Sequence, residues 1–343
     1  MKKTHAILRL GRWLALPALV ALAVAGCTLL RDAATRLPGP RYYEKAAAVI
    51  GEIRAFEQRI GFKETDNFAD LDHETESYPF CGYVSRLYLP YSYEDPAIHW
   101  GEEPTEEECQ SAAGAGADVY FGQTEAVGES GTPVTPSMLA GTLARFVYLV
   151  FHEDCHDQFG LPQGIEEALC NVIAYHAMAA FGRDRRLSGS AIIERVAMNR
   201  FAERESERTR MAKAFYDELA ALYGRHQRDE MTTEALLAAR AGIFAKAETA
   251  LAWEKGSLNN VGIANDMTYS RHFPFLESVH DALGRDLGKT VAFFRQVDAI
   301  KPDRARVVKR HGLRNDQGLD FIRAYEAAVL ETVKKTLSDS TRR

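Results

Sequence analysis

The stretch that decides the fold is Phe146-Val-Tyr-Leu-Val-Phe-His152-Glu153-Asp-Cys-His156. An apolar run that ends in His-Glu-x-x-His predicts a buried helix, and helical residues four apart lie on one face. The imidazoles of His152 and His156 can therefore hold one metal ion. Glu153 lies beside them, in the position of a general base for metal-bound water. The pattern predicts a zinc site; two surface histidines on a charged helix end are the alternative.

A catalytic zinc ion needs a third protein ligand. The turn-rich segment Gly160-Leu-Pro-Gln-Gly164 predicts that the first helix ends and that the chain reverses. A second helix over residues 165–175 then runs back along the first and carries a carboxylate toward the histidines. Glu167 is the expected third ligand. Glu166 stays open, because adjacent helical residues lie about 100° apart, and the pair could instead stabilise a helix N-terminus.

Asn171 extends the predicted site, because it lies one helical turn after Glu167. A ligating histidine usually has a hydrogen-bond partner on its second ring nitrogen, which fixes the orientation of the ring. The amide of Asn171 is the residue that we expect to make this bond.

Cysteine usage is typical of an exported protein. Apart from Cys27, four of the five cysteines remain, and an even number in an oxidising compartment predicts disulfides. The antiparallel helix pair brings Cys155 close to Cys170, so we favour a bond there together with Cys81–Cys109. One of these thiols could instead be a further metal ligand or a small buried core residue.

The N-terminal segment is typical of an export signal. A basic start precedes an apolar run, residues 13–25, that is too short to span a bilayer comfortably. Val24-Ala-Gly-Cys27 resembles the lipobox of bacterial lipoproteins, which implies cleavage before Cys27 and acylation of that residue. We expect a lipid-anchored protein of the bacterial cell envelope, at the outer membrane and facing the periplasm, with Cys27 as its membrane contact. An ordinary signal peptide with a chance cysteine is the alternative.

Composition and patterning set the expected organisation. The net charge of −6 comes from well-mixed acidic and basic residues, which does not favour nucleic acid as a partner. Strands are expected between Tyr78 and Thr124, and long amphipathic helices after residue 184. The fold class is α+β and mostly helical. The expected divisions are a signal peptide (1–26), a tether (27–40), a zinc-site lobe with the small sheet (41–180) and a helical lobe that completes the cleft (181–335).

Several further segments resemble the gluzincin metallopeptidases and, more closely, the predicted bacterial zinc aminopeptidases, which are often lipoproteins. They follow the order of that family and cover most of residues 41–300: Ile53–Phe56 with Ile60–Phe62, Pro79–Tyr83, Ala117–Gly122, Leu258–Ile263 and Phe275-Leu276. The resemblance implies zinc helices beside a small sheet, and hydrolysis of peptides by an aminopeptidase. The family pattern has Asn-Glu where this chain has Glu166-Glu167, and apolar residues where it has Asp154-Cys155.

The resemblance also implies roles for residues outside the zinc helices. Tyr269 matches the family tyrosine after Asn-Asn and is the expected donor to the oxyanion, with His272 as second choice. The strand over residues 118–124, or the loop after it, is expected to pair with the substrate backbone. An aminopeptidase needs an acidic residue for the free amino terminus, and Glu125 and Glu129 are both available.

The leading hypothesis is therefore a membrane-anchored zinc metallopeptidase that acts on peptides in the periplasm. A non-catalytic envelope lipoprotein that serves as a scaffold or binding factor on the same fold is the alternative. A third possibility is that the same ligands support another hydrolysis, such as cleavage of a cell-wall peptide. Exopeptidase and endopeptidase action are both open at this point.

Overall fold

The computed structural model describes residues 43–72, 77–101, 105–126, 131–183 and 191–341. The predicted signal peptide and tether, the predicted acylation site Cys27 and the candidate Glu129 lie outside these ranges, so the lipid anchor stays a prediction. Within them, no helix combines the length and the apolar character needed to cross a membrane.

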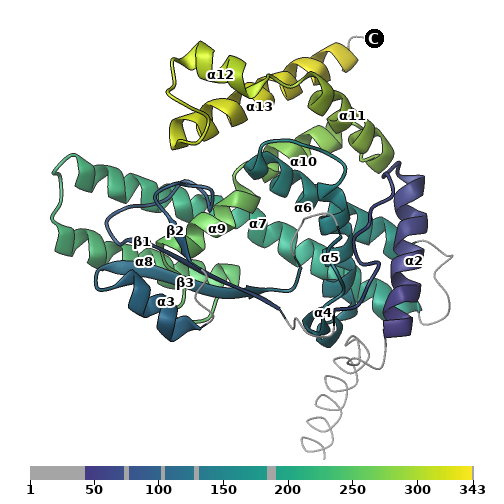
Figure 1. The fold of residues 1–343 in the computed structure, drawn as a ribbon, viewed down its shortest axis with the longest axis horizontal. Helices are drawn as coiled ribbons and strands as arrows, with labels where there is room; N and C mark the ends of the chain where they lie inside the picture. Colours follow the sequence, from purple (N-terminus) through teal and green to yellow (C-terminus); the bar gives the residue numbers. More distant parts are fainter. Residues whose placement is uncertain (1–42, 73–76, 102–104, 127–130, 184–190, 342–343) are drawn as a thin grey trace, which may run out of the picture.

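Helices dominate the described fold, and one small sheet accompanies them (Figure 1). This confirms the mostly helical α+β class. The helices are α2 (Tyr43–Arg59), α3 (Glu106–Ala113), α4 (Pro136–Ala140), α5 (Leu143–His156), α6 (Gln163–Arg183), α7 (Ala191–Gln227), α8 (Thr233–Leu251), α9 (Asn260–Ser270), α10 (Phe273–Ala282), α11 (Leu287–Ile300), α12 (Arg304–His311) and α13 (Leu319–Thr341). The strands are β1 (Tyr78–Ser85), β2 (His99–Gly101) and β3 (Ala117–Thr124).

The sheet is antiparallel in the order β2-β1-β3, so β3 forms one edge. Glycines on one face lie opposite aromatic residues: Gly122 pairs with Phe80, and Gly82 pairs with both Tyr120 and Trp100. A side chain at Gly122 would collide with the ring of Phe80, and one at Gly82 with the ring of Trp100. These glycines therefore let the aromatic rings lie flat on the strands. The disulfide Cys81–Cys109 ties β1 to α3, in the pairing that the sequence favours.

Helices α5 and α6 form the centre of the main core. The hydroxyl of Thr142 caps α5 by accepting a hydrogen bond from the backbone of Arg145. Almost every residue of α5 is buried, including its charged C-terminal half. The turn between the helices leads directly into α6, and the disulfide Cys155–Cys170 joins the two with Cα atoms 5.5 Å apart. The buried face of α5 and the disulfide hold the His-Glu-x-x-His motif against α6.

The buried apolar side chains of the described residues form three clusters. The main apolar cluster extends from Ala46 on α2 to Val333 on α13 and includes α5 and α6. A second cluster joins α7, α8 and α9, and a small third cluster packs the sheet on Val261 of α9. Figure 1 shows the sheet with α3 and α8 on one side of the molecule, and α2, α5 and α6 on the other. The two-lobe division of the chain stays a prediction.

Buried polar contacts fix α9 against β3. The side chain of Asn259 caps α9 and also donates a hydrogen bond to the carbonyl of Val119 on β3, 2.6 Å away. Asp118 accepts a bond from the backbone of Asn260 and a bidentate pair from Arg240, at 2.6 and 2.9 Å. The helix that carries Tyr269 is thereby held at a defined position relative to the edge strand.

Candidate metal centre

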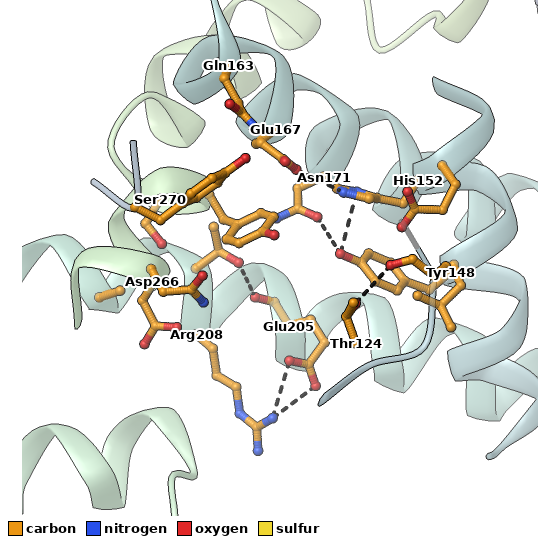
Figure 2. Close-up of a pocket in the computed structure, with 18 of the residues that line it drawn as sticks. Thr124, Tyr148, His152, Gln163, Glu167, Asn171, Glu205, Arg208, Asp266 and Ser270 are labelled. Carbon is orange, nitrogen blue, oxygen red and sulfur yellow. Dashed lines mark hydrogen bonds and ion pairs between the residues drawn. The ribbon is translucent and has the colours of Figure 1, made fainter. Parts of the chain in front are cut away.

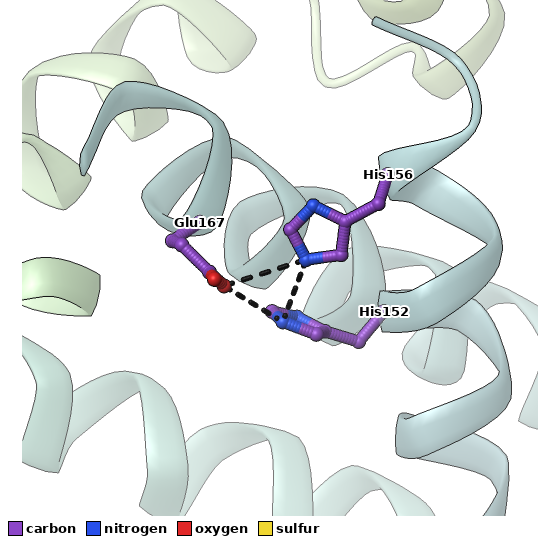
Figure 3. Close-up of side chains that lie close together, drawn as sticks. All are labelled: His152, His156 and Glu167. Atoms are coloured by element: carbon purple, nitrogen blue, oxygen red, sulfur yellow. Dashed lines mark hydrogen bonds and ion pairs between the residues drawn. The ribbon is translucent and has the colours of Figure 1, made fainter. Parts of the chain in front are cut away.

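Three side chains of α5 and α6 converge on one point (Figure 3). Glu167 Oε2 lies 3.1 Å from His152 Nε2 and 3.4 Å from His156 Nε2, and the two nitrogens are 3.4 Å apart. Ligand atoms about 2.1 Å from one tetrahedral zinc ion would lie roughly 3.4 Å from each other. The three atoms therefore have the mutual spacing of a zinc ligand set, and the group could hold a metal ion.

Glu166 and Glu167 lie in different positions relative to the histidines. This difference bears on which of the two is the third metal ligand, a choice that the sequence leaves open. Its Oε1 accepts a hydrogen bond from His156 Nδ1 at 3.0 Å, and its Oε2 accepts one from the backbone of Leu161 at 2.8 Å. Glu166 therefore lies behind His156, on the ring nitrogen that faces away from the other two ligand atoms. Its carboxylate keeps the proton on Nδ1 and leaves the Nε2 lone pair free for a metal.

Tyr148 performs the corresponding task for His152. Its hydroxyl donates to Asn171 Oδ1 at 2.7 Å and lies 3.5 Å from His152 Nδ1 (Figure 2). Because its proton goes to Asn171, this oxygen can accept a hydrogen bond from Nδ1 of the histidine. Asn171 thus reaches the histidine through Tyr148, whereas the sequence predicts direct contact. The signal for Tyr148 was its position one helical turn before His152.

The charges of the group favour a bound cation. Burial alone would raise the pKa of Glu167, but hydrogen bonds from His152 and His156 lower it to about 2. Burial opposes the charged form of His156, yet the hydrogen bonds to Glu166 and Glu167 raise its pKa to about 10. Without a metal ion, His156 is therefore protonated, and a bound ion would displace that proton from Nε2. The ionised, buried carboxylate together with two imidazoles is then a donor set that zinc prefers.

The three ligand atoms face a cleft of about 880 Å³. Glu153 lines the same cleft. Burial raises the pKa of Glu153, and the neighbouring histidines act in the opposite direction. Tyr269 of α9 lines the same cleft, with its ring centroid 6.1 Å from that of His152. The negative charge of Glu167 and burial raise the pKa of Tyr269, so the phenol keeps its proton. The structure thus brings Glu153 and Tyr269 together with the predicted metal ligands.

Tyr93 is a second tyrosine at this centre that the sequence pattern did not indicate. It lines the cleft, and its pKa is raised by burial and by the nearby charge of Glu167. It comes from the loop between β1 and β2, which carries no motif. His272 has another partner, because its Nε2 lies 3.0 Å from Glu326 Oε2 in a buried pair.

The remaining candidates lie at the margin of the cleft or away from it. Glu125 Oε2 accepts a hydrogen bond from Arg145 Nε at 2.9 Å, so its charge is already paired. The ring of His176 packs at a tilt against that of His280, with centroids 4.3 Å apart, and His176 lies 3.9 Å from Glu277. Edge strand β3, in contrast, lines the cleft through Tyr120, Gln123 and Thr124.

Comparison with known proteins shows the family of the chain. A family model described as "putative aminopeptidase" matches residues 65–309, a range that includes the sheet, both helices of the candidate metal centre and α9. The chain belongs to this putative aminopeptidase family. Membership confirms the resemblance found in the sequence and indicates a peptidase. No curated protein and no solved structure matches the chain significantly.

Proposed function

We propose that this member of the putative aminopeptidase family is a zinc-dependent metallopeptidase, and in particular an aminopeptidase. The observation that carries the proposal is the tetrahedral spacing of the ligand atoms of His152, His156 and Glu167, with Glu153 beside them in a cleft. We further propose that acylated Cys27 anchors the enzyme to the envelope, where it would act on periplasmic peptides. The lipobox-like sequence before Cys27 supports this location.

In the proposed reaction, zinc held by the three ligands would polarise the scissile carbonyl and lower the pKa of bound water. Glu153 takes a proton from the attacking water and returns it to the leaving amine. The buried surroundings of Glu153 raise its pKa and so make it a stronger base than an exposed carboxylate. The phenol of Tyr269 remains protonated and donates a hydrogen bond to the carbonyl oxygen as negative charge develops.

The free edge of β3 is suited to hold the peptide backbone. Its other edge pairs with β1, and the carbonyl of Val119 on the free edge is already bonded to Asn259. Backbone groups alternate in direction along a strand, so those of Phe121 and Gln123 also face the free edge. An extended substrate that pairs with these two residues would run along the cleft past the metal centre.

The decisive experiment measures zinc content and peptide hydrolysis together. Wild-type protein should bind one zinc ion per chain and cleave members of a peptide library, and a chelator should abolish the activity. Glu153→Gln should retain zinc and lose hydrolysis by at least about a hundredfold. The matched control is Glu218→Gln, on the exposed face of α7, which should behave like wild type.

Two results would contradict the proposal. One is a Glu153→Gln variant that hydrolyses peptides at the wild-type rate. The other is zinc-loaded wild type that cleaves no peptide in the library, which would favour the non-catalytic scaffold on the same fold.

A further inference from the structure

Asp266 is a carboxylate in the cleft that the proposed reaction does not use. It lines the cleft from α9, and its Oδ2 accepts a hydrogen bond from Trp253 Nε1 at 2.9 Å. Within the part of the chain that the structure describes, no Lys, Arg or His forms an ion pair with it. Burial raises the pKa of Asp266 to about 7. The cleft therefore contains an acid without a cationic partner.

Two aromatic rings, those of Trp253 and Tyr120, lie beside this carboxylate. The ring of Tyr120 lies 5.5 Å from that of Trp253, between centroids, and both rings line the cleft. The charge of Asp266 contributes to the raised pKa of Tyr120, after burial, which shows that the two are close. Phe80 continues the aromatic wall, with its ring 5.3 Å from that of Tyr120. Faces of aromatic rings attract cations, and a carboxylate beside them completes a site for a positive charge.

The position of Asp266 suits contact with a substrate held at the metal centre. Asp266 and Tyr269 are three residues apart on α9, so they share a face and are separated by about 4.5 Å along the helix axis. Figure 2 shows Asp266 on the side of the pocket opposite His152 and Tyr148. Asp266 and Tyr269 therefore line the same cleft from one helix, where a single bound peptide can contact both.

The other charges in this part of the cleft are already paired. Arg208 donates to both oxygens of Glu205, at 3.0 and 3.2 Å, so neither leaves a free charge. Figure 2 shows this pair separate from Asp266. An incoming cation thus meets Asp266, a carboxylate without a cationic partner that lies against the aromatic wall.

We propose that Asp266, with Tyr120 and Trp253, forms a subsite for a cationic nitrogen of the bound peptide. The nitrogen is either the ammonium or guanidinium of a Lys or Arg side chain or the free amino terminus. The assignment rests on the proposed peptidase function for its biological meaning, but the binding itself does not require hydrolysis. A bound cation would ionise Asp266 and supply the positive charge that the protein does not provide.

A series of three amides tests the subsite by binding alone. L-lysinamide carries two ammonium groups, L-norleucinamide carries only the one on Cα, and hexanamide carries none. Calorimetric titration of the zinc-loaded protein, wild type and Asp266→Asn, gives the affinity of each. Loss of a hydrogen bond between Asp266 and a charged nitrogen should weaken binding about tenfold or more. Asp217→Asn, at an exposed position of α7, is the control for removal of an acidic charge.

The pattern of loss identifies which nitrogen binds. If Asp266→Asn weakens only lysinamide, the subsite takes the side-chain cation. If it weakens lysinamide and norleucinamide but not hexanamide, the subsite takes the amino terminus. If all three affinities stay within twofold, or all fall equally, the proposal is wrong. Asp266→Ala is the second variant should the asparagine variant fail to fold, and the same comparisons apply.

Hydrolysis of lysyl and norleucyl coumarylamides separates this inference from the proposed function. If the amides bind as expected but no substrate is cleaved, the subsite stands and the peptidase proposal fails. If both substrates are cleaved and Asp266→Asn changes neither kcat/KM value, the subsite fails and the peptidase proposal stands.

Discussion

Glu166 offers the sharpest test of the proposed metal centre, because the two adjacent glutamates are expected to have different roles. Glu167 would bind the metal, whereas Glu166 would only orient His156. Glu166 supports His156 through one hydrogen bond of 3.0 Å and leaves the ligand atoms untouched. Glu166→Gln keeps an acceptor oxygen but loses the charge, and charge-assisted bonds are roughly twice as strong as neutral ones. We expect a loss of about 1 kcal/mol in zinc binding, or roughly fivefold in affinity.

Glu166→Ala should cost more, because it also leaves the backbone N–H of Leu161 without its acceptor. Loss of the supporting partner of a ligating histidine typically reduces metal affinity by about ten- to a hundredfold. Glu167→Gln removes a ligand outright and should be the most severe of the three. Competition with a chromophoric chelator measures all three affinities on one scale.

Two outcomes would refute this reasoning. Equal zinc affinity for wild type and Glu166→Ala would mean that the bond to His156 contributes nothing. A Glu166→Gln variant as damaged as Glu167→Gln would mean that Glu166 is itself a ligand and that the assignment of the two residues is reversed.

Three further predictions follow from the described contacts. Tyr269→Phe should lower kcat by about a hundredfold or more without loss of zinc, as steady-state kinetics and metal analysis would show. Arg240→Met should destabilise the fold by about 3 kcal/mol in chemical denaturation, because the buried Asp118 would lose its bidentate cation and keep the backbone N–H of Asn260 and the more distant Arg86 Nε, at 3.6 Å. The pKa of His280 is lowered to about 4, mainly by burial and to a smaller extent by the charge of His176. The unfolded protein therefore binds a proton at His280 more readily than the folded protein does. The stability that it contributes should be complete above about pH 6.5 and fall from there toward pH 4, and His280→Asn should flatten that part of the thermal stability profile.

The sequence predicts the parts of this site that depend on local pattern. The i, i+4 histidines, the reversal after Gly160 and the antiparallel return of α6 all follow from helix periodicity and turn residues. The same reasoning gives the proximity of Cys155 and Cys170. These features need only neighbours in the chain, and neighbours are what a single sequence displays.

The residues that complete the cleft could not be found in this way, because their positions depend on packing between distant segments. Asp266 reaches the aromatic wall only because buried bonds dock α9 on β3. Tyr93 comes from a loop whose path is fixed by long-range contacts, among them a bond from its backbone to Thr268. The choice between Glu166 and Glu167 depends on a rotation of α6 that periodicity leaves free.

The charge of the buried site also helps to distinguish the peptidase hypothesis from the non-catalytic scaffold hypothesis. Glu153, Glu166 and Glu167 lie in one wall of the cleft with little exposure to water. Burial of several carboxylates is costly unless positive charge accompanies them. A proton on His156 balances one of them, and a divalent ion held by the Nε2 atoms would balance two and leave that imidazole neutral. Glu153 neither ligates nor supports a histidine, so its burial contributes nothing to a scaffold. The burial of this third carboxylate at the cleft is easier to understand if the chain uses it to move protons.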